Sequence, residues 1–180
     1  WGAVAGWSAV LSNPSRITSW TALSFPHPAA FGAALLDDLD QQERSSYVAF
    51  FQTPWLPETV FSFNSFSVLK ALLAGMSDEK MKEYINVFSE PGALTSALNW
   101  YRALGDDLLF EVEGIESLEV KIPTLFLWGN QDQSVGRVAV DGMAELMKGP
   151  YTNIELEAGH WLFVDKPERI ISEILIHIDQ

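Results

Sequence analysis

Cysteine is absent from this chain of 180 residues. Without thiols there can be no disulfide framework, no thiolate nucleophile and no cysteine-ligated zinc or iron–sulfur cluster. Basic residues are also scarce, with 11 Lys and Arg against 24 Asp and Glu and a formal net charge of −13. Such a surface repels phosphate backbones and anionic membrane surfaces, so the composition argues against nucleic-acid and membrane partners.

Long hydrophobic runs are missing as well. The longest apolar stretches, such as residues 123–128 (PTLFLW), are far shorter than the roughly 20 residues that a transmembrane helix needs. The composition is instead that of a soluble globular protein, because 48% of the residues are of hydrophobic type and only 19% are charged. No pair of the three histidines has the spacing of metal ligands, and we expect neither a metal nor a cofactor.

The chain does not start like a natural amino terminus. Residues 1–7 (WGAVAGW) lack an initiator methionine and a targeting segment, and they already show an apolar, small-residue pattern. We therefore expect this sequence to be part of a longer protein. The sequence leaves the cellular compartment undetermined, with the cytoplasm favoured.

Hydrophobic spacing and turn residues predict an α/β part interrupted by helices. The first α/β segment covers residues 1–25, the second covers residues 121–180, and between them residues 26–120 have helical periodicity and form a predicted lid. The elements predicted within the α/β segments are helices at 1–12 and 137–147, a final helix that starts after Asp165 and includes Ile178, and strands at 16–24, 124–128 and 153–158. Within the lid, distinct helices are predicted at 78–88 and 93–104.

The last helix carries two specific predictions. Asp165 and Glu168 have the spacing of a capping box at its start. The apolar residues that follow at helical spacing predict one buried stripe, formed by Ile170, Ile171, Ile174, Leu175 and Ile178.

Two residues with catalytic chemistry follow consecutive strands of the predicted sheet. Asp132 lies in the turn after the strand at 124–128, and His160 follows the strand at 153–158. A histidine that accepts a proton needs a carboxylate to orient its ring, and neighbouring strand ends can bring the two together. Taken singly, Asp132 suits a turn or a helix cap, and His160 suits a loop. Their joint position favours a catalytic pair.

The other two histidines carry weaker signals. His27 lies between two prolines and is predicted to be a loop residue. His177 belongs to the last helix, where a partly exposed or carboxyl-terminal capping role is predicted.

Five short motifs resemble those of the α/β-hydrolase superfamily, and of its epoxide hydrolases in particular. They are Trp1-Gly2, which resembles the residues after the nucleophile, WGNQD at 128–132, AGHW at 158–161, YVAFFQ at 47–52 and LNWYR at 98–102. The resemblance covers essentially the whole chain. It implies the carboxyl-terminal part of an α/β-hydrolase fold, beginning just after the nucleophile, with a helical lid inserted between strands.

The resemblance also implies a mechanism. An aspartate upstream of Trp1 would attack an epoxide carbon while Tyr47 and Tyr101, one in each lid motif, protonate the epoxide oxygen. Water activated by His160, which Asp132 orients, would then hydrolyse the ester, with the Trp1 backbone N–H in the oxyanion hole.

The implied partners are a small hydrophobic epoxide, water and the missing amino-terminal half of the protein, without which we expect the chain to be inactive. Phe51, Trp1 and Trp161 would line the apolar substrate pocket. Either tyrosine could instead be a core aromatic residue whose hydroxyl group is satisfied. The competing functions are a haloalkane or haloacid dehalogenase, a serine esterase, and a non-catalytic binding protein on the same fold.

Overall fold

The computed structural model describes residues 1–73, 76–104 and 117–179. The chain forms two compact units, of which the first comprises Trp1–Ser45 with Leu109–Gln180 and the second Ser46–Leu108. We call them the sheet unit and the helical unit. The helical unit, Ser46–Leu108, covers fewer residues than the predicted lid of 26–120. Residues 105–116 of that predicted lid lie outside the described residues. The assignment as a lid stays a prediction.

The sheet unit contains three parallel strands in the order β1-β2-β3. They are β1 (Trp20–Leu23), β2 (Thr124–Gly129) and β3 (Tyr151–Leu156). Every residue of the central strand β2 is buried, as its continuous apolar sequence predicts for a strand covered on both faces. Leu127 pairs with Leu23, and Gly129 with Leu156, so the carboxyl ends of all three strands meet at one edge.

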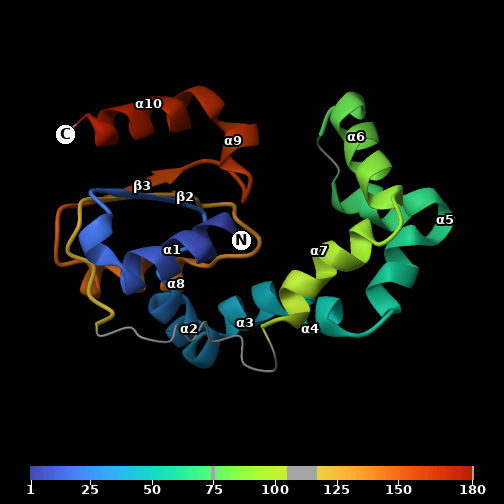
Figure 1. Ribbon diagram of the computed structural model, residues 1–180, viewed down its shortest axis with the longest axis horizontal. Helices are drawn as coiled ribbons and strands as arrows, with labels where there is room; N and C mark the ends of the chain where they lie inside the picture. The colour runs from blue at the N-terminus through green and yellow to red at the C-terminus, as the bar shows by residue number, and fades with distance from the viewer. Residues whose placement is uncertain (74–75, 105–116, 180) are drawn as a thin grey trace. The chain divides into compact units, whose positions relative to one another are not determined.

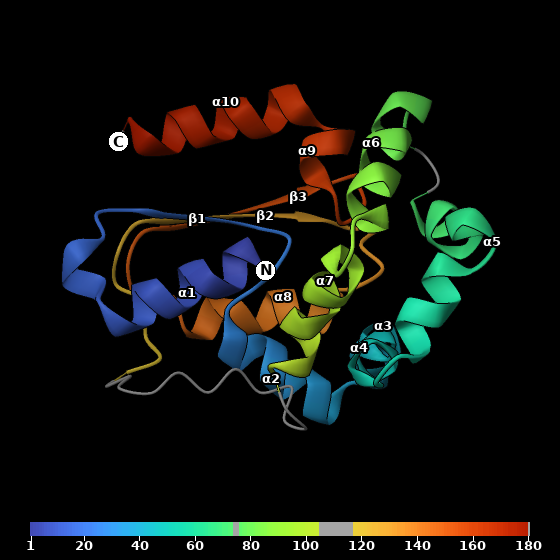
Figure 2. The same cartoon turned by 45° about the vertical axis from the view of Figure 1, so that its right-hand side comes forward.

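Helices cover both faces of this sheet (Figures 1 and 2). α9 (Leu162–Asp165) and α10 (Pro167–Ile178) lie on one face, and α1 (Gly2–Ser12) and α8 (Arg137–Asp141) lie on the other. The sheet unit also contains α2 (Pro28–Asp37), α3 (Leu39–Ser45) and short 3-10 helices at Pro14–Arg16 and Gly142–Glu145.

Alternate side chains of β2 divide the core of the sheet unit into two clusters. Phe126 and Trp128 pack with Trp7 and Met143, whereas Leu125 and Leu127 pack with a second group. The second group contains Ala158, Leu162 and Ile170. This division follows from the period of two in a strand, which turns successive side chains to opposite faces.

The structure corrects four predictions in the carboxyl-terminal part. The helix predicted at 137–147 is only α8, followed by a 3-10 turn. The capping box is wrong, because Asp165 ends α9 and α10 begins without a side-chain cap. The predicted apolar stripe is only partly buried: Ile170 is fully covered, but Ile171, Leu175 and Ile178 are more than half exposed. His177 is buried, not partly exposed, and its Nε2 lies 3.1 Å from the Trp20 carbonyl oxygen.

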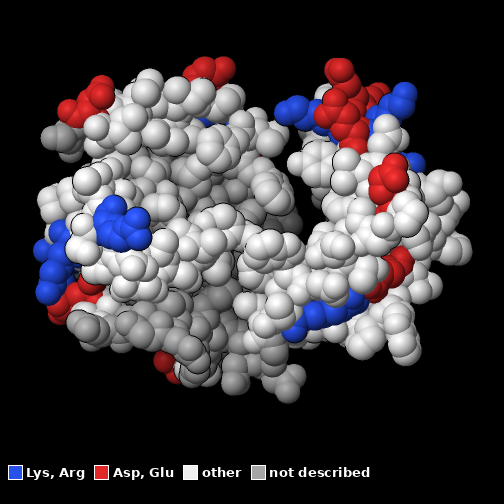
Figure 3. All heavy atoms as spheres, viewed as in Figure 1, with Lys and Arg blue, Asp and Glu red and all other residues white. Residues whose placement is uncertain are grey.

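The helical unit consists of α4 (Tyr47–Gln52), α5 (Leu56–Leu72), α6 (Asp78–Ser89) and α7 (Ala93–Arg102). Non-helical residues at 63–66 interrupt α5. The unit has its own apolar core around Phe61, Leu69 and Leu98. Ser77 caps α6, which the sequence predicted at 78–88, and Figure 3 shows acidic and basic side chains together over this helix. Among the described helices none combines the length and apolarity of a membrane span.

Candidate active site

Asp132 and His160 meet at the carboxyl edge of the sheet. His160 Nδ1 lies 2.8 Å from Asp132 Oδ2, which confirms the contact that the strand order predicts. The Asp132 side chain is fully buried, whereas the His160 side chain is about one-third exposed. An ionised carboxylate only accepts hydrogen bonds, so Nδ1 carries the proton and Nε2 is left as the basic nitrogen. The pair therefore has the geometry of an oriented general base.

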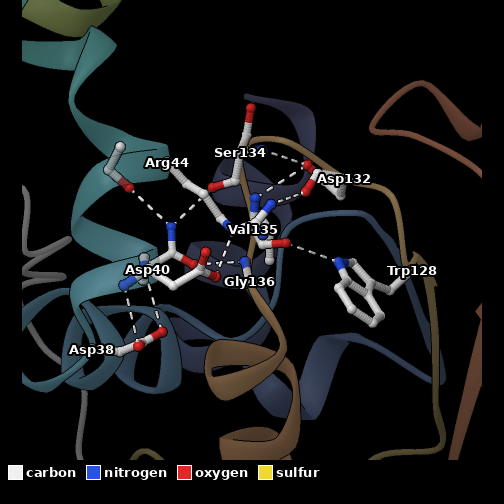
Figure 4. Close-up of polar contacts among 10 residues, drawn as sticks. Asp38, Asp40, Arg44, Trp128, Asp132, Ser134, Val135 and Gly136 are labelled. Carbon is white, nitrogen blue, oxygen red and sulfur yellow. Dashed lines mark hydrogen bonds and ion pairs between the residues drawn. The ribbon is translucent and has the colours of Figure 1, made fainter.

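The turn after β2 fixes the second oxygen of the Asp132 carboxylate. Oδ1 accepts hydrogen bonds from the backbone N–H groups of Ser134 at 2.7 Å and Val135 at 3.1 Å (Figure 4). The Trp128 indole N–H donates to the Val135 carbonyl oxygen at 3.3 Å and ties the turn back to the strand. With one oxygen held by two backbone donors, the other faces His160. Asp132 thus also has the turn-forming role that its sequence context suggested.

Hydrogen bonds between side chains and the backbone also fix the loop that carries His160. Ser24, directly after β1, donates from its hydroxyl group to the His160 carbonyl oxygen at 2.7 Å. The Gly159 N–H donates to Asp165 Oδ2 at 2.7 Å, which explains why Asp165 does not cap α10. Gly129 permits this approach, because a Cβ there would lie 2.2 Å from the Ala158 carbonyl oxygen. The glycine at the end of β2 is therefore required by the loop that carries the histidine.

The two predicted tyrosines pair within the helical unit. The ring centroids of Tyr47 and Tyr101 are 6.0 Å apart, with the planes at 78°. Phe51 packs edge-on against both, at 5.2 Å from Tyr47 and 4.8 Å from Tyr101. Tyr47 begins α4 and Tyr101 lies in the last turn of α7, so tertiary packing brings together residues that are distant in sequence.

A set of polar contacts holds the helix ends that carry these tyrosines. The Gln52 side-chain amide donates to the Tyr101 carbonyl oxygen at 3.1 Å. Arg102 forms a bidentate ion pair with Glu58, at 2.7 and 2.8 Å, and also donates to the Thr53 carbonyl oxygen. The guanidinium group lowers the pKa of the Glu58 carboxyl group, so the pair stays charged in the neutral range.

Comparisons with known proteins find similarity to epoxide hydrolases in both sequence and structure. Human epoxide hydrolase 4 is 32% identical to this chain, covering 97% of the chain and 50% of the human protein. Epoxide hydrolase 3 of Xenopus tropicalis is 30% identical, covering 94% and 48% respectively. The crystal structure of Bacillus megaterium epoxide hydrolase with an inhibitor superimposes with a TM-score of 0.85 at 26% identity, over all of this chain and 67% of that one.

The chain belongs to the α/β-hydrolase superfamily and is epoxide hydrolase-like. The predicted α/β-hydrolase fold is thereby confirmed. No family model matches the chain. The chain spans about half the length of the curated relatives it matches.

Two tryptophans predicted for the site of this epoxide hydrolase-like chain lie in the sheet unit. Trp1 is the N-cap residue of α1, and its side chain is partly exposed. Trp161 is exposed and packs edge-on against the His160 ring at 5.2 Å. The oxyanion role of Trp1 and the substrate-lining roles of Trp161 and Phe51 stay predictions. Across residues 1–73, 76–104 and 117–179, no cluster of three or more His, Cys, Asp or Glu side chains could hold a metal ion.

The sequence analysis missed the support that α3 gives to the acid. Gln41 is fully buried and bonds to the turn after β2, and Arg44 donates to the Asp132 carbonyl oxygen. Both residues lie in a segment of mainly polar sequence, which suggests a solvated surface. No local pattern distinguishes them from their exposed neighbours.

Proposed function

We propose that the complete protein hydrolyses small hydrophobic epoxides to vicinal diols through an aspartyl-ester intermediate. The observation that supports this most strongly is the pairing of Tyr47 and Tyr101. A histidine–aspartate pair is common to several α/β-hydrolase chemistries, whereas two adjacent phenols suit a reaction that must protonate an epoxide oxygen. The epoxide hydrolases among the relatives support the same substrate class.

In the first step of the proposed reaction, an aspartate carboxylate upstream of Trp1 attacks an epoxide carbon. The carbon–oxygen bond of the ring breaks, and Tyr47 or Tyr101 transfers a proton to the leaving oxygen. Without that proton the leaving group would be an alkoxide, which is a poor leaving group in water. The product of this step is a hydroxyalkyl ester of the aspartate.

In the second step, water attacks the carbonyl carbon of the ester. His160 Nε2 accepts a proton from the water, while Asp132 stabilises the imidazolium that forms. The Trp1 backbone N–H donates to the developing oxyanion. Collapse of the tetrahedral intermediate breaks the ester bond, and the imidazolium returns the proton to the departing diol. The proton left on the aspartic acid then passes, through solvent, to the phenolate formed in the first step. Both groups are thereby restored, and the net reaction consumes one epoxide and one water.

Intact-protein mass spectrometry tests this order of events. In the complete protein, His160→Gln removes the base of the second step but leaves the attacking carboxylate ionised. After mixing with an epoxide, we expect an added mass equal to that of the substrate, which persists in this variant and decays in the wild type. Replacing the upstream aspartate by asparagine is the control and should abolish the adduct.

The outcomes separate the competing functions. If His160→Gln stays unmodified and its ring-opening rate falls to background, the histidine acts before any ester forms, as in a serine esterase. A dehalogenase would instead release halide from a haloalkane and leave epoxides intact. A binding protein would retain the epoxide without turnover.

A further inference from the structure

α3 approaches the turn at 132–136 with a buried glutamine. Gln41 has no exposed surface, and its Oε1 accepts a hydrogen bond from the Gly136 N–H at 2.8 Å. Its Nε2 donates to the Ser134 carbonyl oxygen and to Ser45 Oγ, both at 2.9 Å. The orientation of the amide is unambiguous, because Gly136 offers only a donor and Ser134 only an acceptor at these contacts.

Gln41 contacts both ends of the segment 134–136, which supplies the two backbone donors to Asp132. Ser134 and Val135 present the N–H groups that hold Asp132 Oδ1 (Figure 4). Gln41 binds the Ser134 carbonyl oxygen and the Gly136 N–H. The Gln41 side chain is therefore hydrogen-bonded to both ends of the segment 134–136, whose backbone orients the Asp132 carboxylate. Without these two hydrogen bonds, the buried Gly136 N–H and the half-buried Ser134 carbonyl group would lose their Gln41 partner.

The remaining contacts of α3 strengthen this attachment. Asp38 caps the helix by accepting from the Asp40 and Gln41 N–H groups, at 3.3 and 3.2 Å. Arg44, paired with Asp40 at 2.6 Å, donates to the Asp132 carbonyl oxygen. Gly136 lies close to the helix, since a Cβ there would meet Asp40 Oδ2 at 2.9 Å.

We propose that Gln41 is a positioning residue for the Asp132 carboxylate, acting through the turn at 132–136, so that Asp132 Oδ2 faces His160 Nδ1. The geometric part of this proposal concerns the sheet unit alone. Its consequence for catalysis rests on the proposed function, in which His160 activates the water of the second step. A misoriented carboxylate would weaken the hydrogen bond to His160 without removing either partner.

Proton NMR of the complete protein tests the geometric part directly. The hydrogen-bonded Nδ1 proton of His160 gives a low-field resonance, which is assigned by its loss in His160→Gln. Gln41→Met keeps the approximate side-chain length and removes all three hydrogen bonds. We expect the resonance to shift or disappear in this variant. Gln42→Met is the matched control: Gln42 is the exposed neighbour whose side chain donates to the Leu36 carbonyl oxygen and not to the turn at 132–136, and the resonance should stay in place.

Gly136→Ala tests the same contact from the opposite side. The backbone at this position, with φ −87° and ψ 165°, is accessible to alanine, so the new methyl group acts through the space it occupies near Gln41 and Asp40. We expect the same change in the His160 resonance as in Gln41→Met. Circular dichroism confirms that each variant is folded, and Gly136→Ala decides the question if Gln41→Met does not fold.

Kinetics test the consequence for catalysis. In Gln41→Met, ester hydrolysis should slow by roughly ten- to a hundred-fold, the effect of a small misplacement of a catalytic group, while single-turnover ester formation keeps its rate. An unchanged His160 resonance in a folded Gln41 or Gly136 variant would overturn the proposal. If the wild type shows no epoxide turnover, the proposed function fails, yet the resonance comparison still decides whether Gln41 positions Asp132.

Discussion

A buried histidine should make the stability of the sheet unit sensitive to mild acid. His27 has no exposed surface and is the N-cap residue of α2, where its Nδ1 accepts a hydrogen bond from the Ala29 N–H at 3.1 Å. The Trp7 ring packs against it with centroids 5.2 Å apart. Burial lowers the pKa of His27 from 6.5 to about 4, although the Leu118 backbone favours the protonated form. The sequence predicted a loop residue here, whereas the structure shows a buried helix cap.

The sign and size of the effect follow from this difference in pKa. Between pH 6.5 and about 4 the unfolded chain binds a proton at His27 that the folded chain does not bind. The contribution of neutral His27 to the free energy of unfolding is therefore fully present above pH 6.5 and is lost as the pH falls toward 4. At about 1.4 kcal/mol for each pKa unit, the full difference reaches about 3 kcal/mol.

Urea unfolding of the complete protein, at several pH values from about 7 to about 4, measures this contribution. In His27→Asn the shorter amide oxygen can still accept the bond that caps α2, but the group no longer titrates. Carboxylates shared by both proteins contribute equally to acid destabilisation and cancel in the difference. We expect the wild type to lose about 3 kcal/mol more than the variant over this range. Equal losses in the two proteins would refute the reasoning.

Three further predictions concern the candidate site and its support. Tyr47→Phe or Tyr101→Phe should slow ester formation, measured in rapid-quench assays, by roughly ten- to ten-thousand-fold, and the double variant should nearly abolish it. An unchanged rate would mean that both tyrosines are core aromatic residues without a catalytic role. Asp132→Asn should slow ester decay less completely than His160→Gln, as followed by mass spectrometry, because it misorients the base without removing it. Gly129→Ala should lower the free energy of unfolding, measured in urea, by about 1–3 kcal/mol or more, because the new Cβ would clash with the Ala158 carbonyl oxygen. Gly2→Ala is the control and should not lower it, because a Cβ at Gly2 meets no atom within 4 Å.

The sequence by itself determined the strand β2 and the meeting of Asp132 with His160. A continuous apolar run at 124–128 requires cover on both faces, and consecutive parallel strands bring the residues after their carboxyl ends to one edge. Both inferences depend on local pattern and a general topological rule. The two tyrosines were identified by motif, and their pairing is consistent with the roles proposed for them.

Only the tertiary structure decided what surrounds these residues. Gln41 finds its partners about 95 residues further along the chain, and nothing in a polar segment indicates which side chain will be buried there. The spacing of α10 predicts an apolar stripe but not how much of it is covered, so Ile170 is buried and Ile171 is 53% exposed. Asp165 fits a capping box by spacing, yet it binds the Gly159 N–H instead. In each case the outcome depends on which distant backbone group reaches the side chain, and such contacts exist only once the elements have packed together.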